Sequence, residues 1–336
     1  MGRFDDKEKA LDLNEKGVEL SELERYEEAI ACYDKAISLD PELSDAWYNK
    51  GLALDCLERH KEAIACYSEA ISLDPENAEV FYDKGTALYV LKRYEEAIAC
   101  FDEALKLDSE SVGLWQWKGM ALKELNRNEE SIPCFDKDIR MNPESQHSWH
   151  YKGVVLYRLE RYEEAVACYD KAISLDPELS EVWNSKGMSL YKLERYEEAV
   201  ACYDEDIRLD TESQYSWNNK GIALDELERY EEAVACYDKV IAIEPELSDA
   251  WYNKGVSLHN LERYEEAVAC YDEAIKIDPK EADSWIEKGN SLANLERYDE
   301  SIACYDKVIA CYDEANWLDP DHDVDGGGSL DGDGIS

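Results

Sequence analysis

The chain has 336 residues, of which 45% are hydrophobic, and its 79 Asp and Glu against 36 Lys and Arg give a net charge of −43 at pH 7. This apolar content is sufficient for an extended core, while the acidic surplus excludes nucleic acid and anionic membranes as partners because both would be repelled. No segment approaches a transmembrane span and the first residues lack the apolar core of a signal peptide, so we expect a cytoplasmic protein.

A 34-residue unit recurs nine times along the chain. In its second copy, Trp47, Gly51 and Leu54 fall on one side of a first helix, and Tyr67 and Ala70 fall on one side of a second helix. Most copies then close in Leu-Asp-Pro, where Pro ends the second helix. A lone helix pair cannot bury Trp47 and Tyr67 together, so the pattern predicts stacked pairs.

Four positions fix the register of the repeats. Glycine recurs at 17, 51, 85, 119, 153, 187, 221, 255 and 289, always after Lys; a large apolar residue stands four places before it, Ala or Ser twelve places after it, and Tyr or Phe sixteen places after it. This pattern resembles the tetratricopeptide repeat family over about residues 10–320. The resemblance implies an all-α, right-handed superhelical solenoid of nine helix-turn-helix units, with a concave groove lined by the first helices. Lys before the Gly departs from the Leu more usual in the family, and we expect it to alter the inner face of the first helix.

Glycine in the middle of a helix costs roughly 0.5–1 kcal/mol relative to alanine. Its recurrence there implies a steric need, and we expect the facing helix to approach Gly51 closely at Ala63, and likewise in the other repeats. Nine of the eleven cysteines, from Cys32 to Cys304, share one position in the second helix. Equivalent atoms of successive repeats lie too far apart for a disulfide, so we expect small buried thiols in a reducing compartment.

Repeat 4 departs most from the pattern. Asn128 replaces the Tyr at the helix turn, Ser131 replaces the close-contact Ala, and Pro133 stands early in the second helix, so we expect this repeat to be the least stable.

At the position where other repeats have a small apolar residue in the second helix, repeats 4 and 6 have Asp138 and Asp206.

Ten residues after each of these aspartates stands a serine, Ser148 or Ser216. A buried carboxylate must be hydrogen-bonded. We therefore predict a contact from the Ser hydroxyl to the Asp carboxylate at each junction, with partial access to solvent.

The sequence has no Gly-rich phosphate loop, no G-x-S-x-G and no H-E-x-x-H, so we expect neither an enzyme nor a cofactor. His147 and His150 lie one turn apart on a first helix. They either bind a metal together with Glu181 or Asn184, or contact a peptide as polar groove residues, and we favour the peptide.

The resemblance also implies which positions line the groove, namely variable positions of the first helices. They hold Tyr48, Asn49, Tyr82, Tyr89, His150, Tyr151, Tyr157, Asn184, Tyr191, Asn218, Asn219, Tyr252, Asn253 and His259. Tyr offers rigid amphipathic contact area and Asn can pair with an extended backbone, although some of these Tyr residues stabilise only the helix surface. The family's carboxylate clamp needs Lys and Arg at places that here hold Asn14, Tyr48 and Tyr82, so we do not expect that function.

We therefore expect a non-catalytic scaffold that binds a peptide or protein segment, neutral to basic in character, in its groove. A general adaptation to high salt explains the acidic charge equally well and would say nothing about partners. The alternative function is a structural repeat protein that assembles end to end.

Repeat 9 carries an internal duplication, in which residues 302–308 are repeated with small changes as 309–315. Seven residues make nearly two helical turns, so we expect the second helix to run unbroken to about Asn316 or Trp317 with its apolar face in line. No further first helix follows. The face bearing Ile309 and Tyr312 is left open, which predicts end-to-end self-association through residues 301–317, with the helix around Leu11 and Leu13 of another chain as its complement.

The sequence divides into an N-terminal extension (1–9), nine repeats (10–320) and an acidic, Gly-rich tail (321–336). Asp321, Asp323 and Asp325 match the opening of a calcium-binding loop, but its twelfth position would be Gly332 in place of Glu. We expect a disordered tail and no metal, with weak calcium binding as the alternative.

Overall fold

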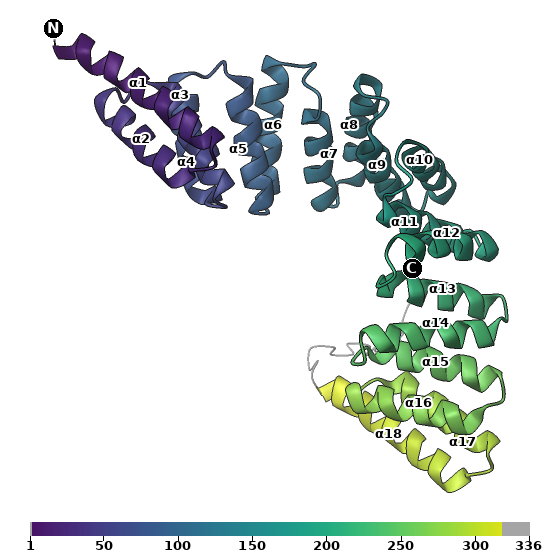
Figure 1. Cartoon of the computed structure of the whole chain (residues 1–336). Helices are drawn as coiled ribbons and strands as arrows, with labels where there is room; N and C mark the ends of the chain where they lie inside the picture. The colour runs from purple at the N-terminus through teal and green to yellow at the C-terminus, as the bar shows by residue number, and fades with distance from the viewer. Residues whose placement is uncertain (1, 318–336) are drawn as a thin grey trace, which may run out of the picture. The chain divides into compact units, whose positions relative to one another are not determined.

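A computed structural model describes residues 2–317 and the side chains of residues 6–309. This part contains eighteen α-helices and no strand. The chain forms two compact units, Met1–Ser189 and Leu190–Ser336, and within each unit consecutive helices pack side by side in chain order (Figure 1). The expected all-α solenoid of tandem helix pairs is confirmed.

Odd-numbered helices are the first helices of the repeats and even-numbered helices are the second. The first unit contains α1 (Gly2–Glu22), α2 (Tyr26–Leu39), α3 (Ser44–Cys56), α4 (His60–Leu73), α5 (Ala78–Val90), α6 (Tyr94–Leu107), α7 (Leu114–Glu124), α8 (Asn128–Met141), α9 (Gln146–Arg158), α10 (Tyr162–Leu175) and the start of α11 (Ser180–Lys192). The second unit contains α12 (Tyr196–Leu209), α13 (Gln214–Glu226), α14 (Tyr230–Ile243), α15 (Ser248–Asn260), α16 (Tyr264–Ile277), α17 (Ala282–Asn294) and α18 (Tyr298–Trp317).

The repeat glycines make room for an aromatic ring. A β-carbon on Gly51 would lie 2.5 Å from Cε1 of Tyr67, and one on Gly255 would lie 2.5 Å from Cε1 of Tyr271. The steric need inferred from the sequence is therefore present. The position of Ala63 also approaches the glycine in repeat 9, where the Ser301 hydroxyl donates to the carbonyl of Gly289 at 2.8 Å. The atoms that a β-carbon would meet first belong to one edge of the aromatic ring on the second helix, namely Cδ1, Cε1 and Cζ of Tyr67.

The turn between the two helices of each repeat uses a left-handed residue that is not glycine. Glu58 has φ of 58°, and the equivalent residues of the other repeats have φ between 57° and 60°. The turn is held by the amide of Arg59, which donates to the carbonyl of Leu54 at 2.9 Å. This 6→1 bond is that of a helix C-cap which usually ends in glycine, so a side chain in this conformation carries backbone strain.

A Lys, an Asp and a Trp join successive repeats. Nζ of Lys50 lies 2.6 Å from Oδ1 of Asp34 on the preceding second helix and 5.8 Å from the centre of the Trp47 ring. The indole N–H of Trp47 also donates to the carbonyl of Pro41 at 3.1 Å, which ties the helix to the loop before it. The same arrangement recurs at later junctions, for example at Lys254. Lys before the Gly thus belongs to the contact between repeats.

The junction between repeats 2 and 3 lacks this arrangement, because Ser68 and Phe81 replace the Asp and the Trp. We expect the Ser68→Asp/Phe81→Trp variant to be more stable by about 1 kcal/mol, since a new ion pair and a new cation–π contact are each worth up to about that amount. Urea unfolding and hydrogen exchange of α4 and α5 measure the gain. Ser68→Asn/Phe81→Trp is the uncharged control, and an equal gain in stability from the two double variants would contradict the prediction.

The predicted contacts between Ser and Asp are confirmed. Oγ of Ser148 donates to Oδ2 of Asp138 at 2.6 Å, and the Ser216 hydroxyl donates to the Asp206 carboxylate. The expected access to solvent was wrong, because Asp138 is 2% and Asp206 is 3% exposed. The next first helix covers each carboxylate, and the serine hydroxyl takes the place of water.

Repeat 4, formed by α7 and α8, has unsatisfied polar atoms in the structure. Oδ1 of Asn128 and Nε1 of Trp115 are buried without a hydrogen-bond partner, and Pro133 stands inside α8. Each feature costs free energy. We therefore expect the amides of α7 and α8 to exchange with solvent before those of α15 and α16. Hydrogen exchange followed by mass spectrometry measures the order, and equal protection of the two helix pairs would contradict it.

The repeated cysteines line the core of each unit as free thiols, and burial raises the pKa of Cys168 to about 11. Cys56 differs from them in being exposed.

Helix α18 runs unbroken to Trp317, as the seven-residue duplication predicts. Ile309 is exposed, whereas the side chains of Tyr312 and Trp317 lie outside the described residues. The tail 321–336, with the calcium-loop candidates Asp321, Asp323 and Asp325, also lies outside them. At the other end, α1 begins at Gly2 and so includes most of the segment treated as an N-terminal extension.

Candidate functional site

The first helices form the inner face of each unit. Among the described residues, contacts between first helices of successive repeats join α1 to α3, α3 to α5, α5 to α7, α7 to α9, α13 to α15 and α15 to α17, whereas second helices of successive repeats make no such contacts within a unit. The row of first helices is therefore the tighter side of the stack, and its exposed side chains face a common surface.

Every predicted groove residue lies on a first helix. Tyr48 and Asn49 lie on α3; Tyr82 and Tyr89 on α5; His150, Tyr151 and Tyr157 on α9; Asn184 and Tyr191 on α11; Asn218 and Asn219 on α13; and Tyr252, Asn253 and His259 on α15. His150 is buried and the others are half-buried.

Polar side chains of successive first helices are joined by hydrogen bonds in the first unit. The Tyr48 hydroxyl donates to Oδ2 of Asp83 at 2.8 Å, and Nδ2 of Asn49 donates to Oδ1 of Asn14 at 3.1 Å. Further along, the indole N–H of Trp117 donates to the hydroxyl of Tyr82 at 3.0 Å. Several predicted groove residues are therefore hydrogen-bonded to a neighbouring repeat, and these bonds orient the rings of Tyr48 and Tyr82.

Asp83 is a carboxyl group of this surface whose pKa is strongly shifted. Burial is the main cause that raises the pKa of Asp83 to about 6; the hydrogen bond from Tyr48 lowers it, and the negative charges of Asp55 and Glu79 raise it further. In the described part of the chain, no Lys or Arg is paired with Asp83. Asp55 accepts hydrogen bonds from Tyr67 at 2.8 Å and shares a contact of 2.9 Å with His60.

We expect Asp83→Asn to make the protein more stable at neutral pH. The raised pKa means that the folded state favours the protonated carboxyl, so the contribution of Asp83 to stability is largest below about pH 4 and is lost as the pH rises through about 6. Asparagine keeps the acceptor for Tyr48 without the charge. The full shift corresponds to about 3 kcal/mol, and solvent screening reduces the expected gain to about 1–2 kcal/mol at pH 7.

Urea unfolding of the two proteins between pH 4 and pH 7.5 tests this expectation. The stability difference should vanish near pH 4 and grow up to about pH 7. A difference that stays constant with pH would show that the charge of Asp83 is not the cause.

Aromatic pairs support the inner face within single repeats. The ring of Tyr89 lies 5.2 Å from Tyr94, at the start of the second helix, and 5.2 Å from Trp117 of the next repeat. Residues at the position of Tyr89 make similar pairs in other repeats. Tyr157 with Tyr162 and His259 with Tyr264 are edge-on pairs, with ring centres 5.4 and 5.1 Å apart, and Tyr191 with Tyr196 is a tilted pair at 5.3 Å. These side chains pack the repeat as well as facing its surface, so replacing their rings would also remove packing.

The two histidines of α9 lie beside Tyr151, whose ring stacks on His150 at 5.5 Å and on His147 at 6.5 Å. Nδ1 of His150 is buried, lies 3.5 Å from Oε1 of Glu181 and makes no well-formed hydrogen bond. Interaction with His150 is the main cause that holds the pKa of Glu181 below its usual range. In the part of the chain with described side chains, no three His, Cys, Asp or Glu residues come together as metal ligands would.

In the second unit, the corresponding surface again pairs hydroxyls with carboxylates. The Tyr191 hydroxyl donates to Oε1 of Glu226 at 3.1 Å, while Asp225 accepts from Tyr237 at 2.7 Å and from Ser257 at 2.6 Å. The side chains of Asn218 and Asn253, both predicted groove residues, are 3.5 Å apart.

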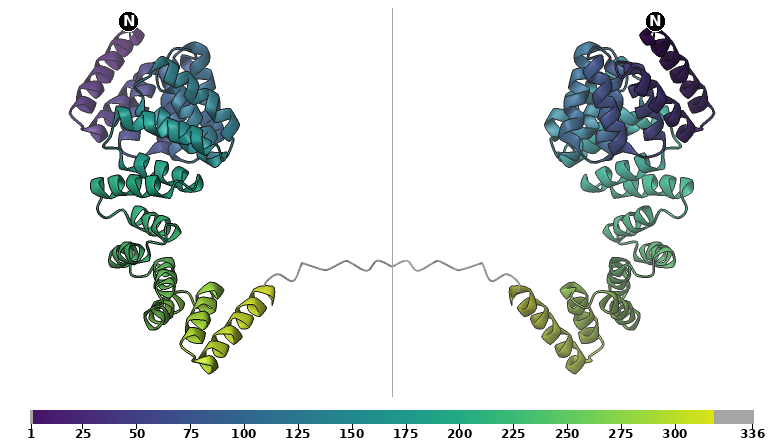
Figure 2. Two further views of the ribbon diagram at one scale, coloured as in Figure 1. Left: turned by 90° about the vertical axis from the view of Figure 1, so that its right-hand side faces the viewer. Right: turned by 90° about the vertical axis from the view of Figure 1, so that its left-hand side faces the viewer.

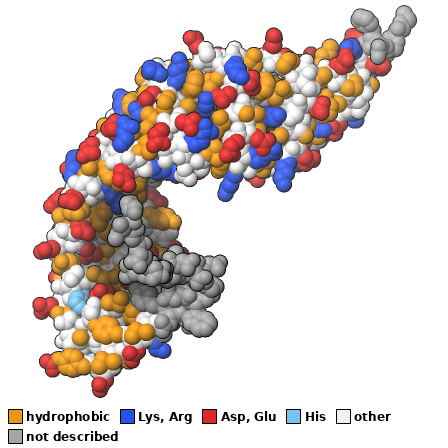
Figure 3. Space-filling model, turned by 180° about the vertical axis from the view of Figure 1, so that it is seen from behind, with side chains coloured by type: hydrophobic (Ala, Val, Ile, Leu, Met, Phe, Trp, Pro, Cys, Tyr) orange, Lys and Arg blue, Asp and Glu red, His pale blue; other side chains and the backbone are white. Residues whose placement is uncertain are grey.

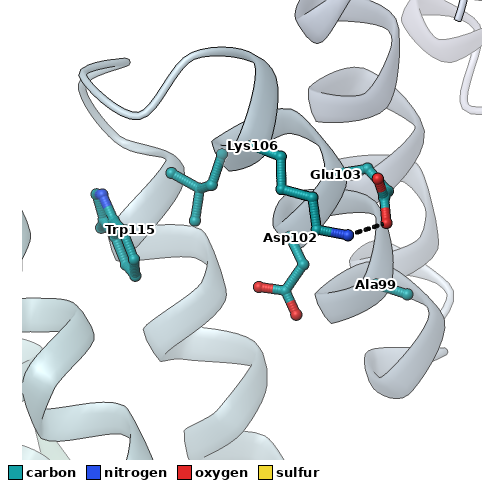
Figure 4. A pocket seen from close by; sticks show the side chains of 6 residues that line it. Ala99, Asp102, Glu103, Lys106 and Trp115 are labelled. Carbon is teal, nitrogen blue, oxygen red and sulfur yellow. Dashed lines mark hydrogen bonds and ion pairs between the residues drawn. The ribbon is translucent and has the colours of Figure 1, made fainter.

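A hollow of about 250 Å³ opens beside the predicted residue Tyr82. Glu79, Asp108 and Val112 also line it, so its charged side chains are acidic. A second hollow, of about 420 Å³, lies between α6 and Trp115 at the second helices and contains none of the predicted residues; there Lys106 donates to Glu103 at 2.6 Å (Figure 4). On the face seen in Figure 3, Asp and Glu are spread among basic and hydrophobic side chains and form no single block.

The carboxylates that accept the Tyr hydroxyls were not predicted from the sequence. Asp83 stands in repeat 3 where Asn49 stands in repeat 2, so its position alone placed it in the groove column. Glu226 stands one turn beyond Ile222 on α13 and had no comparable signal.

Family models for tetratricopeptide repeats match the chain almost without a gap from residue 17 to residue 303. The model described as "Tetratricopeptide repeat" matches residues 44–77, 78–111, 148–179, 215–247 and 248–281, and related models match 17–54, 112–145, 180–213 and 270–303. The chain belongs to the tetratricopeptide repeat family. None of the curated proteins matches it.

Solved structures with the same fold include the C-terminal part of a tetratricopeptide repeat protein from Cytophaga hutchinsonii, at 18% identity and a TM-score of 0.58, covering 72% of this chain and 96% of that one. Another is YrrB, described as a tetratricopeptide repeat protein with an unusual peptide-binding site, at 24% identity and a TM-score of 0.50, covering 55% and 95%. A third is MamA, at 18% identity and a TM-score of 0.50, covering 54% and 98%.

Tetratricopeptide repeats are generally non-catalytic modules that bind peptides or proteins, and membership of the family supports a protein-interaction scaffold. Within the described residues, no helix is long and apolar enough to cross a membrane.

Proposed function

We propose that the inner face of the first helices binds a peptide or protein segment of neutral to basic character. The observation that carries this proposal is the half-buried Asp83, which lies near Asp55 and Glu79 and has no cationic partner in the described part of the chain. A Lys or Arg side chain of a ligand would supply the missing charge. It would also lower the pKa of Asp83 on binding.

The distribution of the basic residues supports the same preference. At the helix turns, arginines are tied to glutamates, as in the bidentate pair of Arg59 with Glu62 at 2.7 and 2.8 Å, and the lysines before the glycines are tied to aspartates of the preceding repeat. These cations are engaged away from the inner face. Lys123, on first helix α7, is a cation of the inner face, and its Nζ lies 2.7 Å from Oε1 of Glu124 and 5.5 Å from the centre of the Tyr151 ring. Around Asp83, the carboxylates therefore remain the charges that a ligand meets.

The aromatic residues supply contact area for such a ligand. Tyr82 lines the 250 Å³ hollow together with Glu79, so an apolar surface and a carboxylate stand side by side. Tyr89 is held between two other rings and gives a rigid surface that loses little conformational entropy on binding.

Fluorescence anisotropy with labelled peptides and the full chain tests the proposal. A peptide alternating Lys with apolar residues should bind, and a peptide of equal length with Glu in place of Lys should not. Glu79→Lys should weaken binding of the Lys peptide by about tenfold, since charge complementarity is reversed at the site. Glu95→Lys, on the second helix α6, changes the net charge equally and should have little effect.

Equal binding of both peptides, or equal weakening by both variants, would contradict the proposal.

We also propose a reducing, cytoplasmic location, supported by the free thiols that line the core in every repeat.

A further inference from the structure

Helix α18 exposes side chains that are buried at the equivalent positions of α16. Ile302 is 58% exposed, whereas Val268 is 8% exposed, and Ile309 is 60% exposed, whereas Ile275 is 8% exposed. Tyr305 is likewise 37% exposed. On α16 these positions are covered by the next first helix, α17, but in the described part of the chain no helix follows α18 (Figure 2). Within residues 2–317, this apolar face of α18 is therefore covered by no other helix.

The exposed residues form one regular stripe. Tyr298, Ile302, Tyr305 and Ile309 are spaced by four, three and four residues, which is the spacing of a heptad repeat. The seven-residue duplication is the unit that extends such a stripe without shifting it, because it adds one whole heptad. The helix, at 20 residues, is about 30 Å long.

Helix α1 of another chain is a poor cover for this stripe. Suppose that α1 of another chain packed on α18 as α17 packs on α16. Its Asp12 would then occupy the position held by Ser284 in α17 and by Ala46 in α3, both of which are fully buried, and it would face the apolar Val308. Burying an unpaired carboxylate there is strongly unfavourable. Residues 318–336 of the same chain contain six Asp residues and only scattered apolar ones, and Asp299 and Asp306 flank the stripe, so charge repulsion opposes that occupant as well.

A second copy of α18 fits better, because it brings an apolar stripe of the same spacing and length. Two such helices can interlock their side chains as in a two-stranded coiled coil. We propose that two copies of the chain form a dimer through the α18 stripe. The contact is self-complementary and closes after two copies, so it does not extend into filaments.

The charge of the chain gives this dimer a characteristic salt dependence. Two chains of net charge −43 repel each other, and Asp306 adds like charges near the contact. Salt screens this repulsion and leaves apolar contact intact. The dimer should therefore strengthen as salt rises, whereas an end-to-end contact based on opposite charges would weaken.

Sedimentation of the full chain over a concentration series, at about 0.05 and 0.5 M salt, tests the proposal. We expect a monomer–dimer equilibrium that is tighter at high salt. Ile302→Glu and Ile309→Glu should each raise the dissociation constant at least about tenfold, a change of about 1.4 kcal/mol. Both positions are exposed in the single chain, so its fold and helix content should not change.

Ala303→Glu is the matched control, since it adds the same charge to the same helix on its other, exposed side. It should leave the dissociation constant close to that of the parent chain. A monomer at all concentrations, larger assemblies, a dimer that weakens with salt, or equal effects of Ile309→Glu and Ala303→Glu would each overturn the proposal.

Discussion

Tyr67→Ala is expected to lower the free energy of unfolding of its repeat by about 3–5 kcal/mol. The Tyr67 side chain is fully buried, its ring fills the space left by Gly51, and its hydroxyl donates to Oδ2 of Asp55 at 2.8 Å. Burial raises the pKa of the Tyr67 phenol, so the hydroxyl stays protonated and remains a donor. Alanine would leave a cavity that the rigid crossing of α3 and α4 cannot close.

Urea unfolding together with hydrogen exchange of α3 and α4 measures this loss. Tyr67→Phe should cost about 1–2 kcal/mol, because it keeps the ring and removes only the hydrogen bond to Asp55. Tyr215→Ala, at a side chain that is 73% exposed, should change stability by no more than about 0.5 kcal/mol. A loss at Tyr67 as small as that at Tyr215 would show that the ring does not carry the packing of the repeat.

Ser216→Ala is expected to cost about 2–3 kcal/mol, more than the removal of an ordinary serine. The substitution leaves the buried carboxylate of Asp206 with the Ser213 hydroxyl, 3.0 Å away, as its remaining side-chain donor. The double variant Asp206→Ala/Ser216→Ala should recover this loss. It recreates the pair found at Ala36 and Ala46, both fully buried, and replacing buried charge by packed apolar groups is often neutral or stabilising.

Urea unfolding of the second unit tests this expectation, with the parent chain, the single variant and the double variant compared. A double variant that is less stable than Ser216→Ala alone would mean that the polar pair stabilises the junction in its own right. In that case the two residues contribute more than mutual satisfaction of a buried charge.

The helix that carries each predicted groove residue could be predicted from the sequence, but the hydrogen bonds that these residues make could not. The register located Tyr48 and Tyr82 on the inner face, because positions along a helix determine which side they face. Their hydrogen bonds to Asp83 and from Trp117 depend on how far one first helix is displaced along the next. The periodicity of residues within a single helix does not predict that displacement.

The amino-acid pattern alone predicted the helix pairs, their register, the contacts of Asp138 with Ser148 and of Asp206 with Ser216, and the length of α18. Each of these follows from periodicity or from the need to satisfy a buried charge. Three features became visible only in the packing of the helices: the Tyr67 ring against Gly51, the contacts of Lys50 with Asp34 and Trp47, and the exposed side chains of α18. The physical reason is that contacts between helices depend on their crossing and on what covers them, whereas a sequence pattern records only the face on which each residue lies.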